Sequence, residues 1–285
     1  NCLKPGDLRH GFCNAFGSVG YLTHLDTMDR AMRLDPHFAK YLILAGSLAV
    51  LAAGRAREAF VLNVGVGTVL QDVRQFNLDA ENSVPAWWSS SMMLFASLLL
   101  YALAANAWRA RDILWRLWLT MAVVFLALSI DEAASFHEGV IEPLRAGFGF
   151  GGILFYAWVV PALLCLAGLG LVLLTLLKRM HASLFWRFGV CSGVFVLGAL
   201  GMEMVGGWLD YEGYRTTAFY ALSISIEEGL EILGVSLFLA ALLDQFDPAR
   251  AVVGDYARHR HATQASPGPQ RKVVGAGAFP ATSAD

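Results

Sequence analysis

Residues 117–138 read LWLTMAVVFLALSIDEAASFHE, and they decide the fold class. The first part of this stretch, 117–130, is almost entirely apolar and has the length of most of a membrane-spanning helix. Asp131, Glu132, His137 and Glu138 then follow with no glycine or proline to end the helix. Charged groups at membrane depth are costly unless they are paired, protonated or hydrated. The stretch therefore predicts a membrane helix that leads into a polar functional site.

The composition of the whole chain indicates an integral membrane protein that lies in a lipid bilayer. Of the 285 residues, 56% are hydrophobic and only 15% are charged, whereas soluble domains carry about 25% charged residues. The net charge of −2 provides no basic surface of the kind that nucleic acid requires, so no nucleic-acid partner is predicted. The four cysteines form no CxxC pair, which argues against a disulfide framework and against a zinc knuckle.

Hydrophobic segments predict an all-α, polytopic transmembrane helical bundle of about six spans. Residues 59–70, which follow Arg55, Arg57 and Glu58, are too few to cross ~30 Å of hydrocarbon as a helix. We predict that they lie at the interface, and a second crossing there is the alternative. Residues 1–37 are predicted to be a polar N-terminal segment, 38–246 the transmembrane domain and 247–285 a disordered tail. The predicted spans are 38–54, 85–108, 117–138, 153–177, 188–208 and 217–243.

Basic residues between the spans predict the orientation of the chain. With six spans, three groups of Lys and Arg fall on one side of the membrane, and the positive-inside rule makes that side cytoplasmic. The C-terminus is then cytoplasmic, although Arg55 and Arg57 would lie near the outer side. The three groups are Arg109, Arg111 and Arg116; Lys178, Arg179 and Arg187; and the arginines of the tail.

This topology predicts that acidic residues of three spans share one polar site that opens to the outer face. Asp131 and Glu138 are seven residues apart and are expected on one face of their helix, as are Glu227 and Glu231. Asp79 and Glu81 precede Pro85 and are predicted at the mouth of the site. The candidate site residues are Asp131, Glu132, His137, Glu138, Glu203, Glu227, Glu228 and Glu231.

Several chemistries fit such a site. Carboxylates with one histidine suit an oxygen-preferring divalent metal such as Mn, Fe, Ca or Mg, and the absence of a second intramembrane histidine argues against zinc. The alternatives are a proton-coupled transporter or permease, a structural subunit of a membrane complex, and an acidic pocket for another cation or a small ligand. No catalytic residue is assigned. The metal-ligand candidates are His137, Glu138, Asp131, Glu203 and Glu228.

Tryptophans near the ends of the predicted spans, among them Trp87, Trp88 and Trp158, are expected to form interfacial belts. Other local combinations are more distinctive. They are NLDAENSVPAWWSS (77–90), LALSIDEAASFHE (126–138), GALGMEMVGGW (198–208) and SIEEGLEILGVSLFLAALL (225–243). Together they resemble a family of uncharacterised bacterial multi-pass inner-membrane proteins, over residues 41–243. The resemblance implies a multi-pass membrane fold and carries no established activity.

Overall fold

The computed structural model describes residues 36–64 and 73–246 of the chain. The predicted N-terminal segment 1–37 therefore lies outside the described residues except for its last two, which begin the first helix. The predicted tail at 247–285 lies outside them as well, and so does the stretch 65–70 of the predicted interfacial segment.

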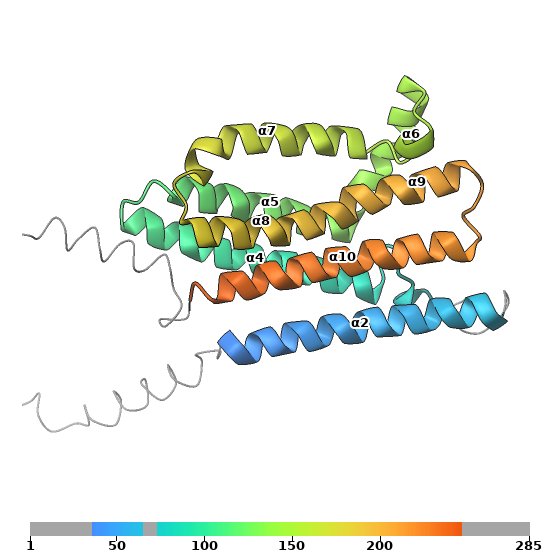
Figure 1. Cartoon of the computed structure of the whole chain (residues 1–285), viewed down its shortest axis with the longest axis horizontal. Coiled ribbons are helices and arrows are strands. Elements are labelled where there is room, and N and C mark those ends of the chain that lie inside the picture. The colour runs from blue at the N-terminus through green and yellow to red at the C-terminus, as the bar shows by residue number, and fades with distance from the viewer. Residues whose placement is uncertain (1–35, 65–72, 247–285) are drawn as a thin grey trace, which may run out of the picture.

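Helices make up the fold, and the described residues contain no strand. The long helices run alternately in opposite directions (Figure 1), which confirms the prediction of an all-α helical bundle. A π-helical turn, η3, joins α8 to α9, so that 182–211 is one continuous helix. The elements are α2 (Pro36–Val64), η1 (Arg74–Phe76), α4 (Val84–Arg109), α5 (Trp115–Ala134), α6 (Phe136–Phe148), η2 (Gly152–Leu154), α7 (Val159–Leu177), α8 (Ala182–Val196), η3 (Leu197–Met202), α9 (Glu203–Tyr211) and α10 (Ala218–Leu243).

Five helices in the described part are long and apolar enough to cross a membrane: α2, α4, α5, α7 and the continuous helix Ala182–Tyr211. A sixth long helix, α10, has 26 residues like α4, but it contains three glutamates and is not among these five. Large apolar side chains such as Leu98, Leu171 and Val172 are exposed on these helices. Their surface suits lipid rather than water, which agrees with a multi-pass membrane protein.

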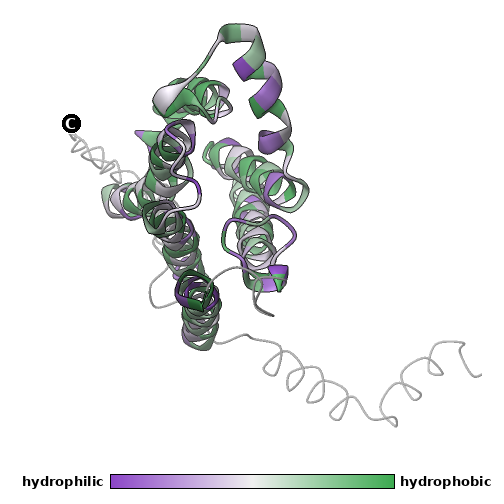
Figure 2. Cartoon of the chain, turned by 90° about the vertical axis from the view of Figure 1, so that its right-hand side faces the viewer, coloured by the Kyte–Doolittle hydropathy of each residue, from purple (hydrophilic) through white to green (hydrophobic). Residues whose placement is uncertain are grey.

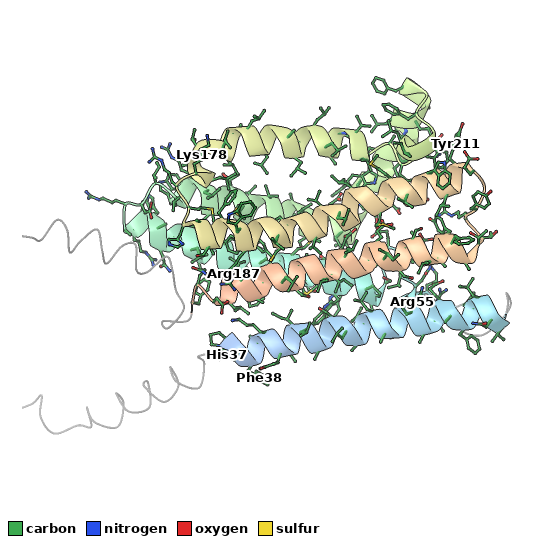
Figure 3. All side chains as sticks on the ribbon, viewed as in Figure 1. His37, Phe38, Arg55, Lys178, Arg187 and Tyr211 are labelled. Carbon is green, nitrogen blue, oxygen red and sulfur yellow. The ribbon has the colours of Figure 1, made fainter. Side chains whose placement is uncertain are left out.

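The bundle has two chemically different ends. Arg109 ends α4, Arg116 lies in the first turn of α5 and Lys178 follows α7, and all three helix ends lie on the same side (Figures 1 and 3). We name this side the basic end. We name the opposite side, where α5 ends and α10 begins, the acidic end. Figure 2 views the molecule from the acidic end and shows hydrophilic residues gathered on α6 there.

The first helix differs from its predicted span. α2 continues without a break through the charged residues 55–58 to Val64, although the sequence analysis ended the span at residue 54. Arg55 donates a hydrogen bond to Ser225 of α10, and Arg57 donates to the backbone carbonyl of Val73 and pairs with Glu58. The prediction was wrong because charged side chains that find partners do not end a helix, whereas helices end at glycine, proline or capping residues.

Close helix packing holds α10 at the centre of the bundle, between α2, α4 and α8. A Cβ atom at Gly234 would lie 2.6 Å from the backbone nitrogen of Phe195, and one at Gly198 would lie 2.9 Å from the carbonyl oxygen of Glu227. These two glycines therefore let the backbones of α8 and η3 touch that of α10, as small residues commonly do in membrane helices.

At the basic end, a buried carboxylate connects three helices. Asp244, which caps α10, is only 5% exposed and forms ion pairs with Lys40 of α2 and Arg187 of α8. Burial alone would raise the pKa of Asp244, but the hydrogen bonds from Arg187 and Lys40 outweigh it and lower that pKa below its usual 3.8. This carboxylate is therefore ionised and serves to fasten the helices together.

Candidate functional site

One cavity of about 890 Å³ runs along the interior of the bundle between α4, α5, α7, α8–α9 and α10. Tyr220 and Phe238 of α10 both line it, and at ~1.5 Å rise per residue they lie about 27 Å apart along the helix. The cavity therefore extends from the acidic end through most of the ~30 Å thickness of a bilayer core.

The wall of this cavity changes character along its length. We name its acidic part the acidic chamber, and its apolar part, toward the basic end, the gallery. The chamber is lined by Glu81, Asp131, Glu132, His137, Glu203, Glu227, Glu228 and Glu231. The gallery is lined by Leu117, Met121, Phe125, Leu166, Leu169, Gly170, Leu173, Leu177, Cys191, Phe195 and Phe238.

All eight candidate site residues line this cavity, and so do the two mouth residues, Asp79 and Glu81. The structure thus brings side chains from α5, α6, α9, α10 and the segment before α4 to one space. Glu138 and Asp79 are exposed at its rim, while the other candidates are half-buried or buried. Their action as a functional site stays a prediction.

The acidic motif of α5 is arranged differently from the prediction. Ser135 adopts a left-handed conformation, with φ 54°, which ends α5 at Ala134 and starts α6 at Phe136. The expectation of a continuous helix with Asp131 and Glu138 on one face was therefore wrong, because the two residues belong to different helices. The carboxylate of Asp131 instead accepts the backbone N–H of His137 at 2.9 Å. It thereby provides a hydrogen-bond acceptor for the first turn of α6.

The same carboxylate holds the imidazole of His137. Nδ1 of His137 lies 2.8 Å from Oδ2 of Asp131, and Nε2 lies 4.0 Å from Oε1 of Glu81. Burial opposes protonation of the imidazole, but the hydrogen bond and the charge of Asp131 outweigh it, so the pKa of His137 is raised to about 8. Burial raises the pKa of Glu81, and the charge of His137 opposes that shift. His137 is thus an oriented group that exchanges protons near neutral pH.

Trp158, the residue before α7, links His137 to the next carboxylate. Its ring centroid lies 4.8 Å from that of His137, and its indole Nε1 donates a hydrogen bond of 2.8 Å to Oε1 of Glu203. Glu203 follows directly on the π-helical turn η3, whose extra residue per turn changes the direction of the side chains after it. Such π-helical turns are frequently found at functional sites.

The acids of α10 form the deepest part of the chamber. Glu227 is 7% exposed, and its Oε2 atom has no hydrogen-bond partner. Glu228 and Glu231 are half-buried and face the same cavity. Oε2 of Glu81 is a second buried oxygen without a partner. Buried polar atoms in folded proteins nearly always have a partner, so each of these two oxygens is available to a hydrogen-bond donor or a cation.

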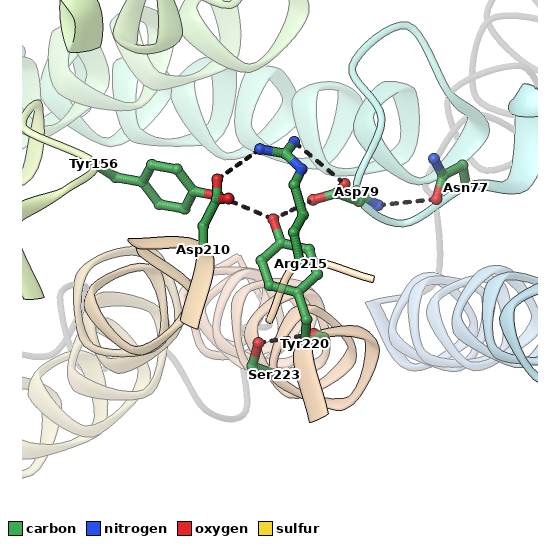
Figure 4. A network of polar contacts seen from close by, with 7 residues as sticks. All are labelled: Asn77, Asp79, Tyr156, Asp210, Arg215, Tyr220 and Ser223. Atoms are coloured by element: carbon green, nitrogen blue, oxygen red, sulfur yellow. Dashed lines mark hydrogen bonds and ion pairs between the residues drawn. The ribbon is translucent and has the colours of Figure 1, made fainter. Parts of the chain in front are cut away.

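A network of aromatic and charged side chains surrounds the mouth of the cavity (Figure 4). The hydroxyl of Tyr156 donates to Asp210 at 2.9 Å and lies 3.0 Å from the hydroxyl of Tyr220, which donates to Asp79 at 3.2 Å. Arg215 donates to Asp210 at 2.7 Å and lies 3.9 Å from Asp79. Burial raises the pKa of Tyr156, which therefore stays a neutral donor. The network joins the segment before α4, the residues before α7, α9 and α10.

The network includes Tyr156, Arg215 and Tyr220, which were not predicted as site residues, and Trp158, which was predicted in the interfacial belt, lies in the chamber instead. Arg215 carried a signal that was available, because it is the only Lys or Arg in the segment that joins the last two spans. A single Arg near Asp210 and Glu212 indicates an ion pair with one of these acids. It does not indicate the orientation of the chain in the membrane, for which groups of Lys and Arg are needed. The tyrosines and Trp158 carried no such signal, since aromatic residues near span ends usually lie at the lipid interface.

Metal coordination is not supported by the arrangement of the donors. Within residues 36–64 and 73–246, no group of three His, Cys, Asp or Glu side chains is placed to hold a metal ion. The predicted ligands, which include His137, Glu138 and Glu203, line one cavity without three of them meeting at a common point.

A family model matches most of the chain. The model is that of a domain of unknown function, DUF8692, and it matches residues 41–246. The chain belongs to this family. The match spans the bundle from α2 to the end of α10 and so includes the chamber and the gallery, which confirms the resemblance to an uncharacterised family. The bacterial inner-membrane location stays a prediction. No curated protein and no solved structure matches the chain.

Proposed function

We propose that this membrane protein binds a cation in the acidic chamber. The observation that carries the proposal is Glu227, which is 93% buried and has an oxygen without a partner facing the cavity. Arg145 and Arg215 are the only Lys or Arg residues among the described lining residues, and both belong to segments at the acidic end. Apart from His137, which pairs with Asp131, the carboxylates deeper in the chamber therefore have no basic side chain beside them among the described residues of the cavity wall, and a bound cation would balance their charge.

The type of cation follows from the form of the chamber. A divalent metal needs several oxygen atoms converging on one point, and the donors of the chamber are spread along its wall instead. An organic ammonium ion accepts such dispersed carboxylates, and the rings of Tyr156 and Trp158, which also line the cavity, offer faces that attract cations. We therefore favour an organic ammonium ion over the metal predicted from sequence.

His137 supports proton-coupled transport as a second function. Cation binding favours the neutral imidazole, because a protonated His137 would repel the ligand in the same chamber. Binding at pH 7 would then release a proton, and exchange of a cation for a proton is the elementary step of a coupled transporter or permease. With the basic end cytoplasmic, the chamber would open to the outer face of a bacterial inner membrane.

Thermal unfolding in the presence of tetramethylammonium tests the proposal. A ligand that binds only the folded state raises the melting temperature by mass action. We expect tetramethylammonium chloride to stabilise the protein in nanodiscs of zwitterionic lipid more than NaCl at equal ionic strength does. The extra stabilisation should vanish in Glu227→Gln and persist in Glu212→Gln, whose carboxyl is exposed and lies outside the cavity.

Other results would overturn the proposal. Equal stabilisation of wild type and Glu227→Gln, or none in either, would show that the chamber binds no ammonium ion. Stoichiometric binding of Mn²⁺ without a response to tetramethylammonium would establish the metal site instead. If both variants only lose stability and no cation has an effect, the acids belong to a structural subunit of a membrane complex.

A further inference from the structure

The cavity continues beyond the acidic chamber, and its second half has different chemistry. The gallery is lined by apolar side chains of α5, α7, α8 and α10, and no Asp, Glu, Lys or Arg is among them. A small hydrophilic ion would occupy the chamber alone and leave this apolar space unfilled. Unfilled apolar volume is destabilising, and water gains few hydrogen bonds there.

We propose that the ligand is an amphiphilic amine from the bilayer, with its ammonium group in the acidic chamber and its hydrocarbon chain in the gallery. This inference rests on the proposed function and adds the class of ligand. Leu166 and Leu177 mark the extent of the gallery on α7, and they lie about 16 Å apart along the helix at ~1.5 Å per residue. That is about half of the ~30 Å bilayer core, the depth that the chains of one leaflet occupy.

The loose attachment of α7 provides the route from lipid. Only Val159 and Leu173 of its 19 residues are buried, and α7 stands apart from the other spans in Figure 1. Leu166, which faces the cavity, is 43% exposed, and Leu164 of the same helix is 69% exposed. A single, sparsely packed helix therefore separates the gallery from the surrounding lipid. Because lipid chains are as apolar as the gallery, a chain can exchange between them at little cost.

Two glycines of α7 offer a matched pair of variants. Gly170 lines the cavity and Gly168 does not, and a Cβ atom at either position would meet no atom within 4 Å. Leucine at Gly170 would fill part of the gallery, whereas leucine at Gly168 makes the same change in helix propensity outside the cavity. The comparison of the two variants separates occupation of the gallery from effects on the helix itself.

Photolabelling tests the inference. The protein in nanodiscs would be irradiated with hexadecylamine that carries a diazirine near the end of its chain, and the labelled peptides would be identified by mass spectrometry. We expect labels on gallery residues of α7 and α8, competition by tetramethylammonium, and strong loss of labelling in Gly170→Leu with none in Gly168→Leu. Loss of the charge partner in Glu227→Gln should reduce labelling by at least about tenfold.

Two results would overturn the inference that the ligand is an amphiphilic amine. One is labelling only on residues that face lipid, and the other is gallery labelling that is equal in Gly170→Leu and Gly168→Leu. The stabilisation by tetramethylammonium that depends on Glu227 would then remain, and the proposed function with it. If neither the stabilisation nor the labelling depends on Glu227, the proposed function and this inference both fail. Labelling that depends on Gly170 but not on Glu227 would show that the gallery holds an ordinary lipid chain, which also overturns the inference.

Discussion

Two buried carboxylates, Asp244 at the C-cap of α10 and Glu227 within α10, differ in how their charge is accommodated at the two ends of the bundle. They are 5% and 7% exposed, so burial does not distinguish them. Asp244 has two cationic partners from other helices, Lys40 and Arg187. Glu227 has an oxygen without any partner, and the only Lys or Arg residues among the described residues of its cavity wall, Arg145 and Arg215, lie at the acidic end.

The presence or absence of charge partners therefore indicates which buried acids of this protein are structural. A charge with partners from two other helices fixes the arrangement of those helices, and removing it leaves the partners uncompensated. A carboxylate that faces a cavity with one oxygen left without a partner contributes little to stability and is costly to keep. Such a group is expected to serve binding, as intramembrane acids usually do.

The largest expected effect is the loss of stability in Asp244→Asn. The substitution leaves Lys40 and Arg187 without their charge partner, and breaking a buried pair costs ~3–5 kcal/mol. Because the side chain of Arg187 is 47% exposed, solvent screening reduces the expected loss to about 1–3 kcal/mol. Reversible unfolding in mixed micelles measures this loss. An unfolding free energy equal to that of wild type would remove the contrast between the two ends.

The second largest expected effect is on the pH dependence of stability, because His137 at the acidic end and Asp244 at the basic end should lose their contributions in different pH ranges. The pKa of His137 in the folded protein, about 8, exceeds its ordinary value of 6.5, so its contribution is complete below pH 6.5 and is lost as the pH rises through 8. The loss amounts to about 2 kcal/mol at ~1.36 kcal/mol per pKa unit. The pKa of Asp244 is lowered, so its contribution is lost only as the pH falls below 3.8.

Melting curves across this range provide the measurement. Stability should decline from pH 6.5 to above 8 in wild type and decline much less in His137→Gln. The variant His181→Gln, at an exposed position at the basic end, should keep the decline of wild type. A decline that persists in His137→Gln would assign it to another group and leave the Asp131–His137 pair without a role in proton exchange.

Glu227→Gln should have a smaller effect on stability, of the opposite sign to Asp244→Asn. A neutral amide removes the cost of burying an ionisable group whose Oε2 atom has no partner, so we expect the unfolding free energy to stay equal or rise by about 1 kcal/mol. The same unfolding assay in mixed micelles applies. A loss as large as that of Asp244→Asn would mean that Glu227 holds the helices together, and the chamber would then be structural.

The sequence predicted the bundle well because its evidence is contained in single segments. Apolar length alone identified α4, α5, α7, the continuous helix of α8 and α9, and α10, since a helix must satisfy its backbone within the membrane wherever it packs. The acids of α9 and α10 reached one cavity with those of α5 because antiparallel spans place their ends on common sides. That inference needed only the direction of each helix and the rise per residue.

The details that failed depend on contacts between segments that are distant in the sequence. α2 continues past Arg55 because Ser225, in another span, accepts its hydrogen bond. Ser135 ends α5 in a left-handed conformation that no local sequence pattern predicts. Asp131 then binds His137 instead of sharing a face with Glu138. The role of Trp158 depends on Glu203, and that of Tyr220 on Asp79 and Tyr156. Such pairings were not predictable from one sequence.

The smallest expected effect is that of replacing, by glycine, a residue in the left-handed backbone conformation. The bundle has one such residue near each end that can be compared. Arg111 after α4, with φ 55°, and Ser135 after α5, with φ 54°, both adopt the conformation that glycine prefers. Arg111→Gly should stabilise the protein by about 0.5–1 kcal/mol, because glycine removes the steric cost of a Cβ atom there. Ser135→Gly should gain less, since the side chain of Ser135 acts on the carboxyl of Glu81 and opposes the rise of its pKa, which glycine cannot do. Equal gains in the two variants, measured by unfolding, would show that Ser135 contributes nothing to the chamber. A smaller gain, together with weaker stabilisation by tetramethylammonium in Ser135→Gly alone, would instead show that this helix break positions Glu81 for the ligand.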